Sequence, residues 1–371
     1  MTLPEKSALK EHLIKLIKLH GPISVSTYMS EALTNPHHGY YVKRNPFGKS
    51  GDFITAPEIS QMFGEMVGLW FADLWLKMDR PFRVHLIELG PGRGTLMADL
   101  IRVLDVLPDF KKAVDIHLVE ASPDLKQVQQ DKLYRFPGKI TWHDTVKSAL
   151  DAAAVDDEAT FLIANEFFDA LPIRQFQKGA LGWHERMVTV NENEDGLTTM
   201  LSPFPLEDLI LPDAMKDAEI HSIIEVSPMA DYISRLIADH ISACFGAALF
   251  IDYGYTDYRT GETLQAVKDH KYTYIYDEPG WADLSAHVNF RKISDIIGQS
   301  GLKILGPVTQ GDFLKRVGID ERAALLCEKA DGEKRDIIMG ELQRLTSPDE
   351  MGKLFKVLGV ISDKNIETVG F

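Results

Sequence analysis

Residues 87–95 read Ile-Glu-Leu-Gly-Pro-Gly-Arg-Gly-Thr, with three glycines at alternate positions between an apolar run and an amphipathic run. Glycine lets the chain turn sharply, and its missing Cβ lets a ligand approach the backbone closely. A glycine-rich turn between a strand and a helix is a recognised context for cofactor binding. We therefore predict a strand over 83–89, a helix over 95–107 and a binding loop between them.

The alternation of apolar strands with helices continues on the C-terminal side of this loop. Such alternation is typical of a parallel, doubly wound sheet in an α/β protein. We expect further strands over 113–120, 139–143, 160–165 and 247–252, and helices over 123–134 and 146–153. Two late apolar stretches, 302–308 and 354–362, complete a predicted Rossmann-like sheet of seven strands whose last two members pair as a hairpin.

Other segments lie before this pattern and within it. Apolar side chains recur at helical spacing in 7–20, 25–33 and 59–77. We therefore expect residues 1–80 to form a helical N-terminal extension, which also contains a loop too long for a plain connector. Residues 81–371 form the predicted main domain. An insertion at about 173–245 contains a hairpin around an Asp-Gly turn, followed by a helix.

The chain of 371 residues is 45% hydrophobic and 26% charged, which is the composition of a folded, soluble protein. Its 40 Lys and Arg against 55 Asp and Glu give a net charge of −15. Binding to a phosphate backbone needs clustered basic side chains, so this balance argues against general nucleic-acid binding. An acidic body could instead steer a basic partner, or serve solubility alone.

The sequence has no signature of a metal centre or of membrane insertion. Cys244 and Cys327 form no CxxC motif, and the adjacent His37 and His38 have no further ligand at metal-binding spacing. No apolar run approaches the roughly 20 residues of a membrane span. Residues 1–12 resemble neither a secretory signal nor a transit peptide. We therefore expect a cytoplasmic protein without a metal site.

The residues around the glycine loop distinguish between two classes of cofactor. Dinucleotide sites use G-x-G-x-x-G and aim a helix N-terminus at a pyrophosphate. Here the third glycine comes one residue early, and Glu88 would repel a pyrophosphate but could hold the cationic amine of S-adenosylmethionine. We predict that S-adenosylmethionine binds at Glu88, Gly90, Pro91, Gly92 and Gly94. The alternative is a plain strand-to-helix turn without a ligand.

Further cofactor contacts are predicted after the next two strands. Glu120 ends the second strand, where an acid can bind the ribose diol, and Ser122 follows it closely. Asp144 comes after the third strand, where an acid can accept a hydrogen bond from the adenine amine. Asp144 could instead cap the helix that begins there.

The fourth predicted strand ends at Asn165 and Glu166, and Asp169 follows. Nucleobase amine methyltransferases carry an Asn/Asp-Pro-Pro-aromatic motif at this place, but both prolines are missing here. A carboxylate suits a cationic amine or a guanidinium better than a neutral base, and it can orient one nitrogen toward a methyl sulfonium. We therefore predict that these three residues are catalytic. Alternatively, Glu166 and Asp169 contact the cofactor or cap a helix.

Five motifs together resemble those of the MidA family, which includes the mitochondrial methyltransferase that assists assembly of respiratory complex I. They are GDFITAPEIS (51–60), ELGPGRGTL (88–96), VEASP (119–123), NEFFDALP (165–172) and DLSAHVNF (283–290). The resemblance spans nearly the whole chain. It implies a class I methyltransferase fold and S-adenosylmethionine-dependent methylation of arginine in a protein substrate, namely a respiratory complex I subunit or a bacterial counterpart.

The resemblance also implies roles for residues outside the sheet pattern. The loop that carries Asp52 and Phe53 would cover the cofactor as a lid. Asp283 joins the predicted catalytic set, and Glu225 and His287 are further candidates to line the substrate mouth. Eukaryotic relatives act in the mitochondrial matrix, whereas a bacterial relative would be cytoplasmic.

Two other functions remain open on the sequence. One is methylation of a small molecule or of a nucleobase amine. The acidic surface argues against a nucleobase within a nucleic acid. The other is an assembly chaperone that binds S-adenosylmethionine without turnover. Glu88, the intact glycines and Glu120 favour an active enzyme, although binding alone is not catalysis.

Overall fold

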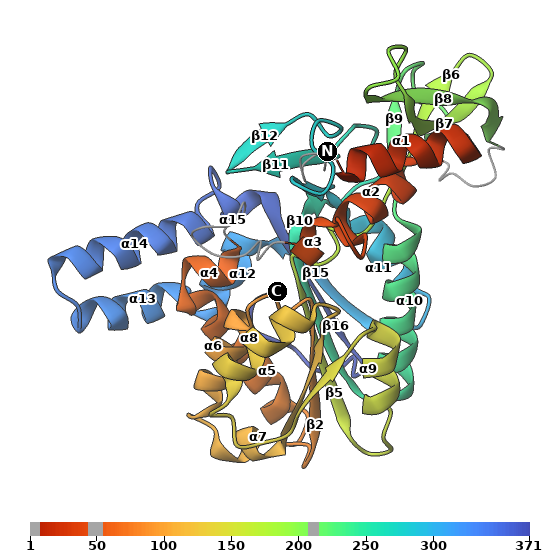
Figure 1. Ribbon diagram of the computed structural model, residues 1–371. Coiled ribbons are helices and arrows are strands. Elements are labelled where there is room, and N and C mark those ends of the chain that lie inside the picture. Colours follow the sequence, from red (N-terminus) through yellow and green to blue (C-terminus); the bar gives the residue numbers. More distant parts are fainter. Residues whose placement is uncertain (1–7, 44–54, 207–214) are drawn as a thin grey trace. The chain divides into compact units, whose positions relative to one another are not determined.

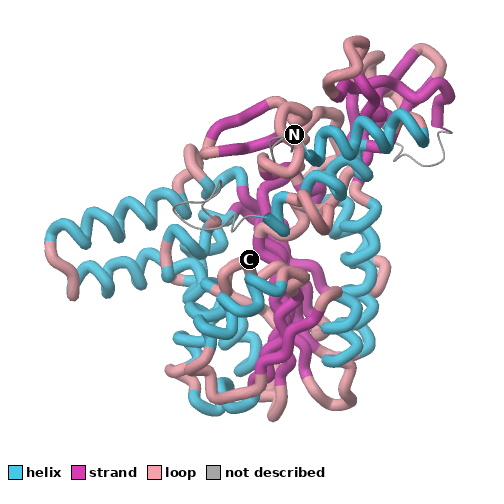
Figure 2. The backbone as a smooth tube through the Cα atoms, in the orientation of Figure 1, coloured by secondary structure: helices cyan, strands magenta, loops and turns pink. Residues whose placement is uncertain are grey.

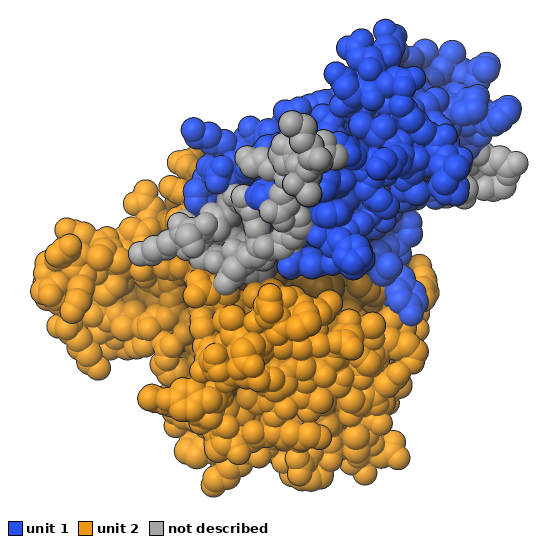
Figure 3. Space-filling view, viewed as in Figure 1, with its two compact units in different colours: residues 1–53, 169–232, 257–289 blue, residues 54–168, 233–256, 290–371 orange. Residues whose placement is uncertain are grey.

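The computed structural model describes residues 8–43, 55–206 and 215–371 (Figure 1). The chain divides into two compact units, each assembled from three stretches (Figure 3). The accessory unit contains Met1–Phe53, Asp169–Tyr232 and Asp257–Asn289, and the sheet unit contains Ile54–Phe168, Ile233–Thr256 and Phe290–Phe371.

The sheet unit is built on a β-sheet in which strands lie in the order β15-β16-β10-β5-β2-β3-β4. The bounds are β2 (Val84–Leu89), β3 (Val114–Val119), β4 (Ile140–His143), β5 (Ala159–Asn165), β10 (Gly246–Tyr255), β15 (Lys303–Thr309) and β16 (Phe355–Ile361). β16 is antiparallel to both β10 and β15, and the remaining pairs along this path are parallel. The predicted α/β fold with a mostly parallel sheet is therefore present.

β2 and β5 lie in the middle of this sheet, and all of their residues are buried. Successive side chains of a strand point to opposite faces, so neighbouring residues of β5 identify what covers each face. Phe161 stacks on Phe71 of α5 at 5.4 Å between ring centroids, whereas Thr160 hydrogen-bonds to His240 of α10 (Oγ1 to Nε2, 2.9 Å). Helices thus cover both faces (Figures 1 and 2), which explains why these strands read as continuous apolar runs.

The helices assigned mainly to the sheet unit fall into three groups along the chain. Before and between the first strands are α4 (Ala56–Ile59), α5 (Gln61–Lys77), α6 (Thr95–Leu104), α7 (Pro108–Ala113), α8 (Pro123–Leu133) and α9 (Val146–Ala153). Around β10 and β15 are α10 (Pro228–Ala243) and α11 (Phe290–Gly298). Between β15 and β16 are α12 (Gln310–Val317), α13 (Ile319–Glu328), α14 (Gly332–Thr346) and α15 (Met351–Leu354).

Two boundaries differ from those expected from the sequence. Helix α5 belongs to the sheet unit and not to an N-terminal extension, because its aromatic side chains pack on elements of that unit. Phe71 stacks on Phe161 of β5, and Trp75 stacks on Phe110 of α7 at 5.0 Å. β15 and β16 do pair, but they are not a hairpin, since the four helices α12–α15 separate them.

The accessory unit combines the N-terminal helices with the two later stretches, Asp169–Tyr232 and Asp257–Asn289. Its helices are α1 (Ala8–His20), α2 (Val25–Thr34) and α3 (Tyr40–Lys43), and its strands are β1 (Ile23–Ser24), β6 (Arg174–Gly179), β7 (Gly182–Val190), β8 (Leu197–Leu206), β9 (Ile223–Val226), β11 (Gln265–Lys268), β12 (Lys271–Thr273), β13 (Asp283–Ser285) and β14 (Val288–Asn289). β7 and β8 form the predicted hairpin, and β1 pairs with β7 (Ile23 opposite Val188). Leu13, Tyr28 and Val188 share one buried core with Leu284, so residues distant in sequence form one unit.

The described residues contain neither a membrane-spanning helix nor a cluster of metal-ligating side chains. None of their helices is both long and apolar enough to cross a bilayer. No group of three or more His, Cys, Asp or Glu side chains among them could hold a metal ion.

Candidate functional site

The glycine loop between β2 and α6 has a backbone that only glycine adopts readily. Gly90, Gly92 and Gly94 have φ of 62°, 52° and 74°, in the left-handed region that a Cβ disfavours. A hydrogen bond from Gly94 N to Pro91 O (2.7 Å) closes the loop, and one from Gly90 N to Val119 O (3.1 Å) joins its start to the end of β3. The alternate glycines are therefore a geometric requirement of this turn.

Glu88, just before the loop, is a buried carboxyl group that lacks a full set of partners. Its side chain is 3% exposed, and Oε2 has no hydrogen-bond partner among the described residues. Burial raises the pKa of Glu88 to about 8. A buried carboxylate is costly unless a cation or hydrogen-bond donors compensate it. Glu88 therefore has the properties expected of a group that receives a cationic ligand.

Glu120, after β3, is held in one orientation by two donors. Ser122 N donates to Oε1 (2.8 Å), and Gln129 Nε2 donates to Oε2 (3.2 Å). Burial raises the pKa of Glu120, and the backbone N–H of Ser122 opposes that shift. Ser122 also caps α8, where its Oγ accepts a hydrogen bond from Leu125 N (3.4 Å). The predicted ribose acid is thus fixed before any ligand binds.

Gln129 is a component of this site that the sequence analysis missed. It lies on α8, its side chain is fully buried, and it also donates to Gly92 O (2.8 Å). The buried positions of α8 are Leu125, Gln129 and Leu133, spaced at i, i+4 and i+8. A polar residue in the middle of an apolar helical stripe is the signal that could have identified it.

Asp144 is exposed and forms an ion pair with Lys126 (Oδ1 to Nζ, 2.5 Å), which lowers the pKa of Asp144. The alternative that Asp144 caps the following helix is wrong. Thr145 is the N-cap of α9, and its Oγ1 accepts a hydrogen bond from Ser148 N (3.1 Å). Asp144 therefore remains available at the end of β4.

The end of β5 carries two of the predicted catalytic residues close to the glycine loop. Leu89 of β2 lies opposite Ala164 of β5, so Asn165 is level with the start of the loop. A Cβ on Gly90 would approach the ring of Phe167 to 3.0 Å, which confirms this proximity. Asn165 is 8% exposed, and its Oδ1 has no hydrogen-bond partner among the described residues.

Glu166 has an unusual backbone and a defined contact. Its φ is 47°, and its Oε1 accepts hydrogen bonds from Ala56 N (2.9 Å) and Asn165 Nδ2 (3.4 Å). Asp252, on β10, holds the segment after Glu166 by accepting a hydrogen bond from Phe168 N (3.0 Å). A non-glycine residue in the left-handed region is strained and often occurs at functional sites.

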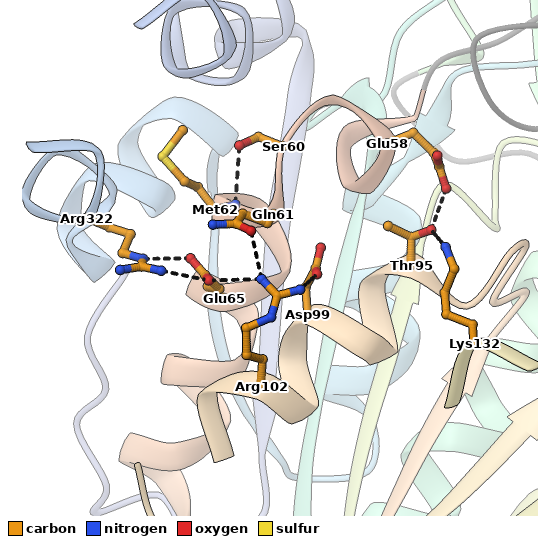
Figure 4. Close-up of polar contacts among 10 residues, drawn as sticks. All are labelled: Glu58, Ser60, Gln61, Met62, Glu65, Thr95, Asp99, Arg102, Lys132 and Arg322. Carbon is orange, nitrogen blue, oxygen red and sulfur yellow. Dashed lines mark hydrogen bonds and ion pairs between the residues drawn. The ribbon is translucent and has the colours of Figure 1, made fainter. Parts of the chain in front are cut away.

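Helix α4 joins the end of β5 to the start of α6. Its first residue, Ala56, donates to Glu166, and its Glu58 Oε1 accepts a hydrogen bond from Thr95 Oγ1 (2.5 Å). Lys132 Nζ donates to the same Thr95 oxygen (2.5 Å; Figure 4). The sequence suggested a lid here, and the predicted lid residues Asp52 and Phe53 lie outside the described residues.

The remaining candidates, Asp169, Asp283 and Glu225, belong to the accessory unit. Asp283 Oδ1 accepts a hydrogen bond from Tyr41 OH (3.1 Å). Burial raises the pKa of Tyr41, and the nearby carboxylates of Asp283 and Asp169 raise it further. These two acids therefore lie around one phenol group, which sequence analysis did not include.

Glu225 has a different environment, in which both carboxylate oxygens are used by the fold. Oε1 accepts hydrogen bonds from Gln175 Nε2 (2.8 Å), Thr263 N (3.0 Å) and Leu264 N (3.1 Å), and Oε2 accepts one from the Thr263 hydroxyl. It fastens β9 to the segment that leads into β11. Glu225 is therefore better explained as a structural residue than as a substrate contact.

Comparisons with known proteins agree with this geometry. A family profile described as "Putative S-adenosyl-L-methionine-dependent methyltransferase" matches residues 66–308. A Xenopus tropicalis protein named "Protein arginine methyltransferase NDUFAF7, mitochondrial" is 38% identical over 389 residues, covering 98% of this chain and 87% of its own. The Homo sapiens protein of that name is 38% identical over 376 residues, covering 96% of this chain and 84% of its own.

A solved structure supports the same assignment. The Burkholderia thailandensis protein crystallised with S-adenosyl-homocysteine has a TM-score of 0.81 and 27% identity, with 97% of this chain and 95% of that chain covered. The α/β fold is thus that of a methyltransferase, and S-adenosylmethionine is its methyl donor. The chain belongs to the family of S-adenosyl-L-methionine-dependent methyltransferases that the profile describes.

Proposed function

We propose that this methyltransferase modifies arginine side chains of a protein substrate. The observation that carries the proposal is the pair of buried oxygens without a described hydrogen-bond partner, Glu88 Oε2 and Asn165 Oδ1, at the same end of adjacent strands. The first suits the ammonium group of the cofactor and the second suits an N–H of the substrate. The names of the relatives, which are protein arginine methyltransferases, favour a guanidinium as that substrate.

Within this proposal, the residues of the sheet unit divide into cofactor contacts and substrate contacts. Glu88, the glycine loop with Pro91, Glu120, Ser122 and Asp144 hold S-adenosylmethionine, which supplies an electrophilic methyl group when bound. Asn165 accepts a hydrogen bond from the guanidinium and turns one nitrogen toward the methyl group. Orientation of this kind is the main contribution a protein can make to such a transfer.

Proton removal also needs an acceptor, because a guanidinium has a pKa above about 12. Glu166 is the proposed acceptor in the sheet unit, since its carboxylate adjoins Asn165. Asp169 and Asp283 remain proposed catalytic residues from the accessory unit. Asp52 and Phe53 remain proposed cofactor contacts on the lid loop. The proposed substrate is a respiratory complex I subunit or its bacterial counterpart, and the proposed compartment is the bacterial cytoplasm.

The decisive experiment pairs cofactor calorimetry with methylarginine mass spectrometry in cells that lack the gene. Wild-type protein should bind S-adenosylmethionine and restore at least one methylarginine site. Glu166→Gln keeps a side-chain oxygen for Ala56 N but loses its charge, so it should keep cofactor affinity and lose about 100-fold or more in transfer rate. The exposed Glu328→Gln is the matched control and should behave as wild type.

One result would contradict the proposal, and two others would change the role of Glu166. Absence of any methylarginine that depends on the gene, together with normal cofactor binding, would favour a small-molecule substrate or a chaperone. Near-normal transfer by Glu166→Gln would remove that residue from the catalytic set. Equal losses of affinity and rate would make Glu166 a cofactor contact.

A further inference from the structure

The side chain of Gln129 is a buried polar group whose nitrogen and oxygen are both hydrogen-bonded. It is fully buried between Leu125 and Leu133 on the inner stripe of α8. Nε2 donates to Gly92 O (2.8 Å) and to Glu120 Oε2 (3.2 Å), and Oε1 accepts from Trp142 Nε1 (2.8 Å). An amide without these partners would be costly at such a position.

The identity of the neighbours determines which way the amide group faces. An indole N–H can only donate, so Trp142 must meet the amide oxygen of Gln129. The amide NH₂ therefore faces the two acceptors, Gly92 O and Glu120 Oε2. No other orientation satisfies all three contacts, and the amide is locked without help from a ligand.

This locked amide joins the two halves of the cofactor site. Gly92 is the central glycine of the loop, with φ of 52°, and Glu120 is the proposed ribose acid. Gln129 also packs against the third glycine, because a Cβ on Gly94 would lie 3.4 Å from Gln129 Cγ. One side chain thus sets the loop backbone and the carboxylate relative to each other. Being neutral, it does so without cancelling the charge of Glu120.

We propose that Gln129 is a positioning residue for cofactor binding. It holds Gly92 and Glu120 so that the backbone of the loop and the ribose acid meet S-adenosylmethionine in one geometry. This inference rests on the proposed cofactor contacts and goes beyond them, because Gln129 acts through other residues. Pre-organisation of this kind raises affinity by reducing what must be ordered on binding.

The first test replaces Gln129 by Met, which has a similar length and cannot make the hydrogen bonds. We expect the affinity for S-adenosylmethionine, measured by calorimetry, to fall about tenfold or more. This is the scale expected when buried hydrogen bonds are lost and one of them goes to a carboxylate. In the methylation assay, KM for the cofactor should rise more than kcat falls. Gln130→Met, at an exposed position of the same helix, is the matched control and should bind as wild type.

A double-mutant cycle tests whether Gln129 acts through Glu120. The Kd values of Gln129→Met, Glu120→Gln and the double variant should be non-additive, with the double variant weaker by less than the product of the two single effects. A residue that only supports the fold would give independent effects. Additive losses, or wild-type affinity in a folded Gln129→Met protein, would overturn the inference.

A second substitution covers the case in which Gln129→Met does not fold. Gln129→Glu preserves shape, but when ionised it places a carboxylate against Glu120 and Gly92 O. Its affinity relative to wild type should fall as pH rises, because the ionised group repels the Glu120 carboxylate. A ratio that stays constant with pH would overturn the inference. Failure of wild-type protein to bind S-adenosylmethionine would instead contradict the cofactor site itself.

Discussion

Glu65 on α5 and Glu88 on β2 are both 3% exposed and lie in the same unit, yet their surroundings are opposite. Glu65 receives a bidentate contact from Arg322 (Nε 2.7 Å, Nη2 3.0 Å) and a third bond from Arg102 (3.3 Å; Figure 4). No arginine among the described residues donates a hydrogen bond to Glu88, and burial raises the pKa of Glu88 to about 8. One glutamate is compensated by the chain, and the other is left for a ligand to compensate.

The difference between these two surroundings distinguishes a residue that stabilises the fold from one that is suited to bind a ligand. A buried carboxylate with its cations in place ties helices together. Removing Glu65 takes this partner from Arg322, whereas Arg102 keeps its ion pair with Asp99. A buried carboxylate without a cation weakens the fold of the ligand-free protein, so it is informative about binding. The same Glu→Gln substitution at the two positions should therefore have opposite consequences.

Glu65→Gln should produce the largest change in stability. We expect the free energy of unfolding to fall by about 3 kcal/mol, the lower end for a broken buried pair, because Arg322 and Arg102 are partly exposed. Affinity for S-adenosylmethionine should change less than about twofold in the folded protein. Urea denaturation and calorimetry measure the two quantities. A stability loss well below about 1 kcal/mol would show that the ion pairs of Glu65 with Arg322 and Arg102 contribute as little as surface pairs do.

Glu88→Gln should give the reverse pattern. Affinity for S-adenosylmethionine should fall by about 10- to 100-fold, the scale of one charge-assisted hydrogen bond. The free energy of unfolding without ligand should stay the same or rise, since the variant no longer bears the cost of keeping a buried carboxyl protonated above its ordinary pKa. If the variant binds the cofactor normally, the ammonium group is held elsewhere, and the comparison with Glu65 loses its meaning.

The pH dependence should follow from the raised pKa of Glu88. The native protein keeps this carboxyl protonated up to about pH 8, whereas the unfolded chain releases the proton near 4.5. Ligand-free stability should therefore decline as pH rises from about 4.5 to 8, relative to Glu88→Gln. Cofactor affinity should rise over the same interval, because the ammonium favours the ionised form. Melting temperatures and calorimetry in paired buffers measure both, and parallel pH curves for wild type and variant would refute the assignment.

Asp144→Asn should have the smallest effect. The side chain is exposed, so a hydrogen bond to the adenine amine is worth little more than one to water. We expect a two- to fivefold loss of cofactor affinity. Asp151→Asn, another exposed acid paired with a lysine (Lys147, 2.6 Å), is the control and should bind as wild type. Identical affinities for the two variants would remove Asp144 from the site.

The features that were predictable from the sequence are those set by local spacing. Alternate glycines after an apolar run located β2, the loop and α6, and the helix expected over 146–153 has those bounds in the structure. Local patterns also located the acids after β3 and β4. Each of these inferences depends on residues within one turn or strand of each other, where the periodicity of the chain carries the information.

The features that were missed depend on contacts between distant parts of the chain. The Ala56–Glu166 bond joins residues 110 positions apart, and the core shared by Leu13, Val188 and Leu284 joins three separate stretches. The periodicity of apolar residues along the chain does not predict such long-range contacts. Helix α14 was missed for another reason: most of its side chains are exposed, so it lacks the apolar stripe that marks a helix in a sequence.

The accessory unit is assembled from three separate stretches of the chain, and this affects how it folds during synthesis. Helices α1 and α2 end by residue 34, but their core partners extend to Ala286. At about 5–20 residues per second, a ribosome needs on the order of 10–50 s to supply the missing segment. During that interval the apolar faces of both helices lack their native cover, and closing so long a loop is slow. Synthesis of this enzyme therefore has an early, aggregation-prone phase in which chaperones that shield nascent chains should matter most.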